Sequence, residues 1–94
     1  MENKKWTFLS NHGRVFSYLA RHPDNTTQLI AQEVGLSIRA VQKIIDDLEN
    51  DGYLHRQKIG RCNHYSIHPD MPMRHRMESD HTVRELLLTH LPSR

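Results

Sequence analysis

Residues 35–54 carry side chains suited to contacting nucleic acid, followed by side chains that nucleic acid would repel. Arg39, Gln42 and Lys43 come first, and the run then turns acidic at Asp46, Asp47, Glu49 and Asp51. An arginine can donate two hydrogen bonds to guanine, a glutamine can pair with N6 and N7 of adenine, and a lysine can bind a phosphate. The pattern therefore predicts a DNA contact that begins with this segment and ends where the carboxylates start.

The same segment has the period of an amphipathic helix. Its apolar residues fall within an arc of about 100°, the width of a stripe that faces a protein core; they are Val41, Ile44, Ile45 and Leu48. Ser37 is a suitable N-cap and Gly52 a suitable end, so a helix is predicted over residues 37–51. Within it, the i,i+4 spacing of Lys43 and Asp47 predicts an ion pair.

Two helical patterns precede this helix. The first is predicted over residues 10–22, because Pro23 disfavours helical geometry in the residue before it. The second begins at a cap from Thr26 or Thr27 and stops at Gly35, which suits a left-handed position. Helices joined by so short a turn form a helix-turn-helix, whose second helix enters the major groove by its N-terminal turns. The acidic half of that helix is then expected to point away from DNA, toward solvent.

Farther along the chain, strand patterns over residues 53–59 and 63–68 flank the turn sequence GRCN and predict a β-hairpin. The hairpin is basic, with Arg56, Lys58 and Arg61. Because side chains alternate along a strand, Arg56 and Lys58 share one face. Arg61 is at or near the tip, where it could reach the phosphate backbone or an adjacent minor groove.

A connector and a last helix complete the chain. The run PDMPM contains two prolines and is predicted to be irregular, and residues 82–91 are predicted to be helical, with Thr82 and Glu85 spaced as a capping box. The predicted fold class is mainly α with one β-hairpin: three helices, the hairpin and a C-terminal helix. No stretch approaches the roughly 20 apolar residues that a membrane-spanning helix needs.

The run LIAQEVGLSIRAVQKIIDDLENDGYLHRQKIGRCNHY resembles the core of winged helix-turn-helix transcription regulators of the MarR/ArsR-like type. It contains the second helix, the turn, the recognition helix and the wing in that order. A longer run, from LSNHGRVFSYLARHPD to HPDMPMRHRMESDHTVRELL, is similar to small bacterial and archaeal regulators of about this length. The resemblance implies a regulator that binds duplex DNA as a homodimer.

These expectations divide the chain into an N-terminal extension (1–9), a winged helix-turn-helix domain (10–68), and a connector with a C-terminal dimerisation helix (69–94). The recognition helix is 37–51 and the wing is 53–68. The residues expected to read bases are Ser37, Ile38, Arg39 and Gln42. Those expected to bind the DNA backbone, or to lie beside it, are Lys43, Arg56, Lys58, Arg61, Asn63 and His64 in the recognition helix and wing, and Thr27 and Gln28 at the start of the second helix.

A homodimer is also expected from the two terminal helices. Apolar residues span an arc of about 200° in each, whereas a surface helix needs about 100°. In a domain of 94 residues the extra apolar surface is expected to meet a second copy. The residues expected there are Val15, Phe16, Leu19, Val83, Leu87, Leu88 and Leu91. Two recognition helices would then read pseudo-palindromic half-sites about 10 bp apart, or a multiple of that. The alternative is that each helix is wedged between neighbours of its own chain.

Other functions remain open on the residues alone. A winged helix can serve protein–protein contact, although such a module needs no basic hairpin. Eight histidines invite a metal-responsive regulator, in which His75 and His81 could converge. Cys62, beside Arg61, could be a redox switch.

The composition limits what else the chain could do. A single cysteine excludes an internal disulfide and favours a reducing cytoplasm, and the net charge of +2 is too small to indicate nucleic acid by itself. No phosphate-binding glycine loop, nucleophile elbow or paired-carboxylate motif is present, so neither an enzyme nor a cofactor is expected. An effector, if there is one, is expected at the dimer interface.

Overall fold

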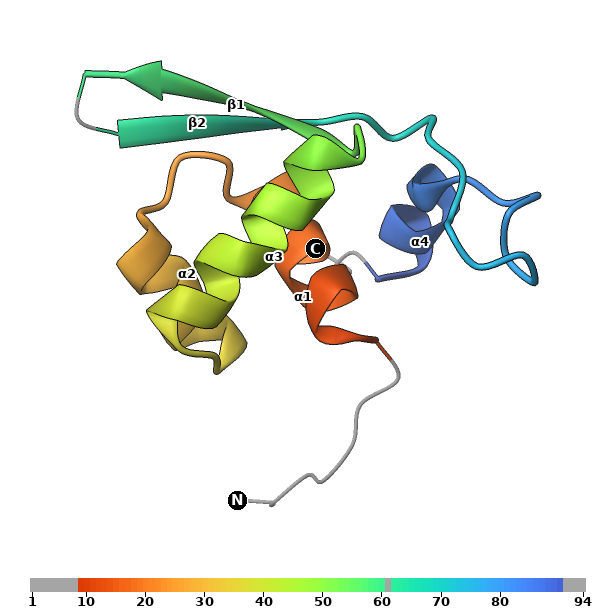
Figure 1. Ribbon diagram of the computed structural model, residues 1–94, viewed down its shortest axis with the longest axis horizontal. Helices are drawn as coiled ribbons and strands as arrows, with labels where there is room; N and C mark the ends of the chain where they lie inside the picture. The colour runs from red at the N-terminus through yellow and green to blue at the C-terminus, as the bar shows by residue number, and fades with distance from the viewer. Residues whose placement is uncertain (1–8, 61, 91–94) are drawn as a thin grey trace.

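The computed structural model describes residues 9–60 and 62–90. Its elements, in chain order, are α1 (Asn11–Arg21), α2 (Thr27–Val34), α3 (Ile38–Asn50), β1 (Leu54–Ile59), β2 (Cys62–Ile67) and α4 (Val83–His90). Three helices, an antiparallel hairpin and a last helix follow one another as predicted, and Figure 1 shows the hairpin extending past α2 on the side away from α4. The fold is a winged helix-turn-helix.

Local side-chain hydrogen bonds set where the first three helices begin. The hydroxyls of Ser10, Thr26 and Ser37 each accept a hydrogen bond from the backbone N–H three residues later. Each bond satisfies an N–H group that the first turn of a helix would otherwise leave without a partner. The caps predicted for the second and third helices are confirmed, with Thr26 rather than Thr27 opening α2.

Glycines follow the ends of two helices. Gly35 ends α2 before the turn, and Gly52 follows α3 before the wing. Gly35 has a φ of 77° and Gly52 a φ of 88°, left-handed values that other residues rarely adopt. After Gly52, the N–H of Tyr53 donates to the carbonyl of Leu48 at 2.8 Å, which closes the C-terminus of α3 and turns the chain into β1.

The hairpin is held against the helices along β2 as well as β1. Arg56 pairs with Tyr65, and Ile59 pairs directly with Cys62, so β2 begins one residue earlier than predicted. The N–H of Tyr65 donates to the carbonyl of Pro23 at 2.9 Å. This bond fixes the middle of β2 to the turn between α1 and α2.

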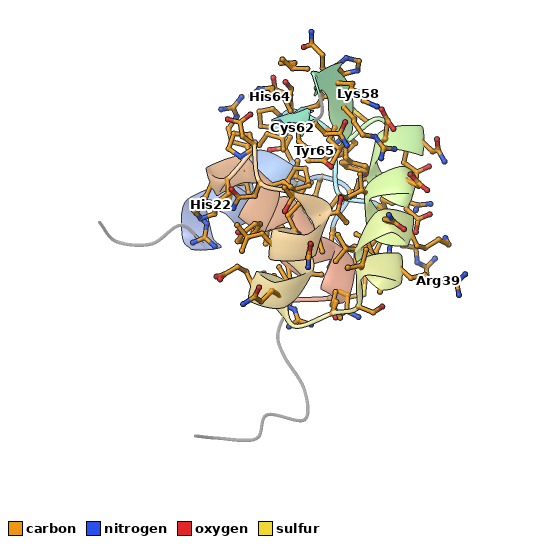
Figure 2. The ribbon with its side chains drawn as sticks, turned by 90° about the vertical axis from the view of Figure 1, so that its left-hand side faces the viewer. His22, Arg39, Lys58, Cys62, His64 and Tyr65 are labelled. Atoms are coloured by element: carbon orange, nitrogen blue, oxygen red, sulfur yellow. The ribbon has the colours of Figure 1, made fainter. Side chains whose placement is uncertain are left out.

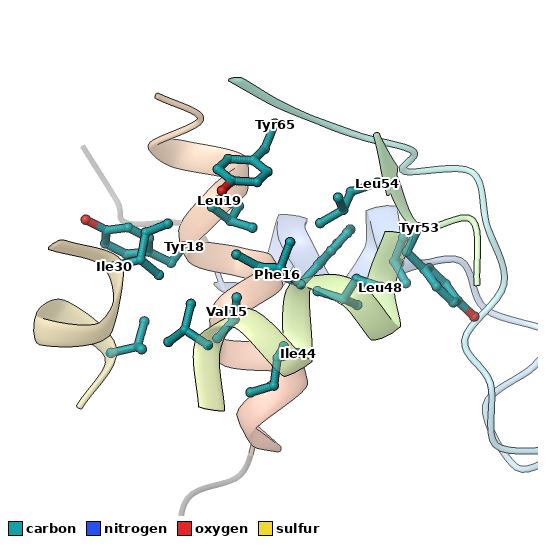
Figure 3. Packing of buried hydrophobic residues seen from close by; sticks show 14 of the residues in the cluster. Val15, Phe16, Tyr18, Leu19, Ile30, Ile44, Leu48, Tyr53, Leu54 and Tyr65 are labelled. Atoms are coloured by element: carbon teal, nitrogen blue, oxygen red, sulfur yellow. The ribbon is translucent and has the colours of Figure 1, made fainter. Parts of the chain in front are cut away.

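Helix α1 lies at the centre of the core and contacts α2, α3, β2 and α4. Figure 3 shows the buried cluster around it, with side chains from the helices and from both strands. Val15 and Leu19 are 0% exposed and Phe16 is 2% exposed. The wide apolar arc of α1 is therefore covered by its own chain, and these three residues offer no surface to a second copy.

The C-terminal segment packs back onto this core. Residues 68–82, here called the connector, end in a bridge between Pro72 and Thr82, and α4 follows. Val83 and Leu87 of α4 are buried in the same cluster as α1. Of the other residues expected to dimerise, Leu91 and the side chain of Leu88 lie outside the described residues. None of the helices in the described ranges has the length and apolar character needed to cross a membrane.

Candidate nucleic-acid interface

The first turns of α3 present polar side chains to solvent. Arg39 and Gln42 are exposed, and the side chain of neither has a hydrogen bond or ion pair within the described ranges. Figure 2 shows Arg39 standing clear of the body near the start of α3. Ile38, beside it, is 44% exposed, an unusual environment for isoleucine. These side chains are exposed to solvent at the start of α3.

One turn later, Lys43 is held by a carboxylate that also binds the first helix. Its ammonium lies 2.8 Å from Oδ1 of Asp47, which confirms the predicted i,i+4 pair. The other oxygen of Asp47 lies 2.8 Å from Nε2 of His12 in α1. The hydrogen bonds from Lys43 and then His12 lower the pKa of the Asp47 carboxyl, and the bond to Asp47 raises the pKa of Lys43.

Two carboxylates in the acidic half of α3 form ion pairs with Arg56 of the wing. Nη2 of Arg56 lies 2.8 Å from Oδ1 of Asp46 and 2.8 Å from Oε1 of Glu49. The backbone N–H of Arg56 also donates to Oε2 of Glu49, at 3.3 Å. The hydrogen bonds from Arg56 lower the pKa of Glu49, and those to Asp46 and Glu49 raise the pKa of Arg56.

The connector supplies a further cation to the end of α3, because Arg74 pairs with Asp51 at 3.0 Å. Carboxylates that were expected to point into solvent thus bind a histidine of α1 and arginines of the wing and the connector. The change of charge sign along α3 divides a basic, solvent-facing start from an acidic end that joins the helix to its neighbours.

Lys58 is the second basic residue of β1, after Arg56, and lies toward the outer end of the wing. Lys58 is exposed and its side chain has no hydrogen bond or ion pair to another described residue, and Figure 2 places it near the top of the molecule, well above Arg39. Asn63, its cross-strand partner, lies with its amide nitrogen 3.4 Å from the hydroxyl of Tyr65. Arg61 lies outside the described residues.

His64 contacts the protein itself. Its Nδ1 pairs with the carboxylate of Asp24 in the turn between α1 and α2. This contact and the one between His12 and Asp47 were missed from the sequence, since their partners are 40 and 35 residues apart and no local spacing announces them. At the start of α2, Thr27 is half-buried and Gln28 is exposed.

The residues that could bind a metal are dispersed. Among the residues that the structure describes, no three His, Cys, Asp or Glu side chains are grouped so as to hold an ion. His81 pairs with Glu85, whereas His75 accepts a hydrogen bond from the N–H of Met77, so the two histidines have separate partners. Cys62 is exposed and unpaired with another cysteine.

A cavity of about 310 Å³ lies between α1, the C-terminal half of α3, the connector and α4. Phe16 and Tyr53 are among its apolar lining residues, and His12, Asp47 and Arg74 are among its polar ones. Any effector was expected at an interface between two copies, but this cavity lies within one chain.

A helix-turn-helix followed by a two-stranded wing, with exposed polar side chains at the start of its second helix, defines a winged-helix DNA-binding domain. Residues 9–55, half of the chain, match the model of the winged helix-turn-helix DNA-binding family. The chain belongs to this family.

Solved structures of similar fold are of longer chains, and the aligned part covers about half of each. A single-site mutant of ZitR from Lactococcus lactis aligns with 72% of this chain and 48% of its own, with a TM-score of 0.56 and 18% identity. FabT from Streptococcus pneumoniae, in complex with DNA, aligns with 94% of this chain and 56% of its own, with a TM-score of 0.62 and 16% identity. This chain thus spans about half the length of these proteins, and at such identities the likeness concerns the fold alone. In sequence, the chain has no significant match among the curated proteins.

Proposed function

We propose that this protein is a sequence-specific transcription regulator that binds double-stranded DNA as a homodimer in the cytoplasm. The observation that carries the proposal is the division of α3: Arg39 and Gln42 are exposed and unpaired, while the carboxylates farther along the helix bind cations of the same chain. Repulsion between those carboxylates and phosphates is thereby reduced. The membership in a DNA-binding family and the fold shared with FabT, solved in complex with DNA, support it.

In this proposal the start of α3 enters the major groove. Ser37, Ile38, Arg39 and Gln42 read bases, with Ile38 offering an apolar contact to a thymine methyl group. Contacts to the DNA backbone come from Lys43, Lys58, Arg61, Thr27 and Gln28, and Asn63 and His64 lie beside them in the wing. The carboxylate of Asp47 holds Lys43 at one side of the helix, so the lysine exchanges one anion for another when it binds phosphate.

The proposal places the contact between the two copies at the last helical segment. Val83 and Leu87 are buried inside the chain, so the proposal assigns the second copy to the other two residues expected at the interface in that segment, Leu88 and Leu91. Two-fold symmetry would then pair two recognition helices with a pseudo-palindromic site.

The test is selection of bound sequences from random duplex DNA at several salt concentrations, followed by affinity measurements on the enriched site. Arg39→Ala should cost about 1–3 kcal/mol on that site and relax the preference for it. Lys58→Ala should weaken binding to all sequences alike and reduce the slope of log affinity against log salt by about 0.9 for each phosphate that the protein no longer neutralises. Arg76→Ala is the matched control and should change neither, because it removes an exposed cation of the connector whose side chain makes no hydrogen bond or ion pair with another described residue.

Three outcomes would contradict parts of this proposal. Equal effects of the Arg39 and Lys58 substitutions on every sequence would refute the division between base-reading and backbone-binding residues. Salt-sensitive binding without an enriched sequence would leave a non-specific DNA-binding protein. Absence of binding even at low salt would favour a winged helix used for protein–protein contact.

A further inference from the structure

We infer that Arg56 is a positioning residue: it fixes the wing on the recognition helix and so sets where Lys58 meets the DNA backbone, without contacting phosphate itself. This inference rests on the proposed function. It replaces the expectation, based on charge alone, that Arg56 binds DNA.

Arg56 is bound to α3 through both its side chain and its backbone. Its guanidinium reaches Asp46 and Glu49, each at 2.8 Å, and its backbone N–H reaches the second oxygen of Glu49 at 3.3 Å. Glu49 therefore fixes both the strand and the side chain at this position. The Arg56 side chain is 29% exposed, whereas that of Lys43, which the proposal assigns to phosphate, is 72% exposed.

The charge around Arg56 also disfavours a phosphate. Two carboxylates face one guanidinium, so the group as a whole carries one excess negative charge. A phosphate that took Arg56 would leave Asp46 and Glu49 unneutralised beside a third anion. Glu49 is 31% exposed, so losing its partner would leave a partly desolvated charge unpaired.

The place of Arg56 along β1 explains what it can control. Residues 57–60, which follow it, are all exposed, so Arg56 is the last residue of this strand that is anchored to a helix. Lys58 is two residues farther on and on the same face, roughly 6.6 Å away at 3.3 Å per residue. Strand β2 has its own attachments, from Tyr65, the cross-strand partner of Arg56, to Pro23 and from His64 to Asp24. Releasing Arg56 would therefore free the β1 edge of the wing while the β2 edge stays held.

A double-mutant cycle on the selected duplex tests this. Arg56→Gln should weaken binding by about the same factor as Lys58→Ala, and the double variant should bind no more weakly than Lys58→Ala alone. In the Lys58→Ala background, Arg56→Gln should leave the salt slope unchanged. Combined with Arg39→Ala, its effect should multiply, because Arg39 reads the groove from the other end of α3. A direct phosphate contact predicts the opposite: multiplying effects with Lys58→Ala and a further fall in slope of about 0.9 per phosphate.

Glu49→Gln is an independent variant that leaves Arg56 itself unchanged. If Arg56 bound phosphate, removing the competing carboxylate of Glu49 would raise the affinity for the duplex. The factor lost on adding Lys58→Ala would then stay the same as in the wild-type background. If Arg56 positions the wing, the factor lost on adding Lys58→Ala should shrink in the Glu49→Gln background. Circular dichroism and thermal unfolding establish that each variant is folded, and this second cycle decides the matter should Arg56→Gln not fold. Wild-type protein that binds no duplex would refute the proposed function and this inference with it, whereas binding with multiplying effects in both cycles would refute the inference alone.

Discussion

Leu19→Ala tests whether α1 is a core helix or a dimerisation helix. The apolar arc of α1 was expected to meet a second copy, but Leu19 is 0% exposed within one chain. It lies in the cluster that joins α1 to the other elements. Truncating it should therefore destabilise each chain by itself.

The magnitude follows from the burial. Replacing a fully buried leucine by alanine costs about 2–5 kcal/mol, the loss of transfer free energy plus the cavity left behind. A domain of 94 residues is expected to have a free energy of unfolding of about 5–14 kcal/mol. The substitution should thus remove a large share of it and lower Tm by roughly 8–40 °C, at about 4–8 °C per kcal/mol.

Urea unfolding at several protein concentrations is the assay, and Leu29→Ala is the matched control. Leu29 undergoes the same change in a helix but is 39% exposed, so its loss should cost at most about 1 kcal/mol. Leucine and alanine differ little in helix propensity, so the contrast measures burial.

Two results would refute this reasoning. Equal destabilisation by both substitutions would mean that burial of Leu19 does not set its contribution. A Leu19→Ala variant that stayed fully stable as a folded monomer, and lost only the ability to dimerise, would show that α1 belongs to the interface after all.

Two further predictions concern the turn and the last helix. Gly35→Ala should cost on the order of 1 kcal/mol in urea unfolding, with Gly35→Asn costing less, because a Cβ there meets no atom within 4 Å and the φ of 77° alone opposes alanine; equal costs for the two variants would contradict this. The hydrogen bond to Glu85 raises the pKa of His81 in the folded protein. The interaction therefore stabilises the fold fully below the pKa of His81 in the unfolded chain, about 6.5, and this contribution is lost as the pH rises through the pKa in the folded protein. His81→Asn should accordingly flatten the fall of unfolding free energy above about pH 6.5, and an unchanged pH profile would exclude this role.

The sequence by itself determined the features that depend on residues a few positions apart. The hydroxyl of Ser37 and the missing side chain of Gly35 act on backbone groups within one turn, so the ends of α2 and α3 could be predicted from residue type. The pair between Lys43 and Asp47 followed from the i,i+4 spacing of a helix. The apolar stripe of α3 likewise required only the helical period.

Only the tertiary structure decided which partner each remaining charge would take and which apolar faces would be covered. Arg56 had the chemistry to bind phosphate, but the fold places it against Glu49. His12 meets Asp47 across 35 residues. Val15 had the pattern of an interface residue, but four other elements of the same chain pack around α1 and bury it. Spacing along the chain fixes neighbours within a turn or a strand, whereas contacts between elements depend on how those elements pack, and that packing is a property of the whole chain.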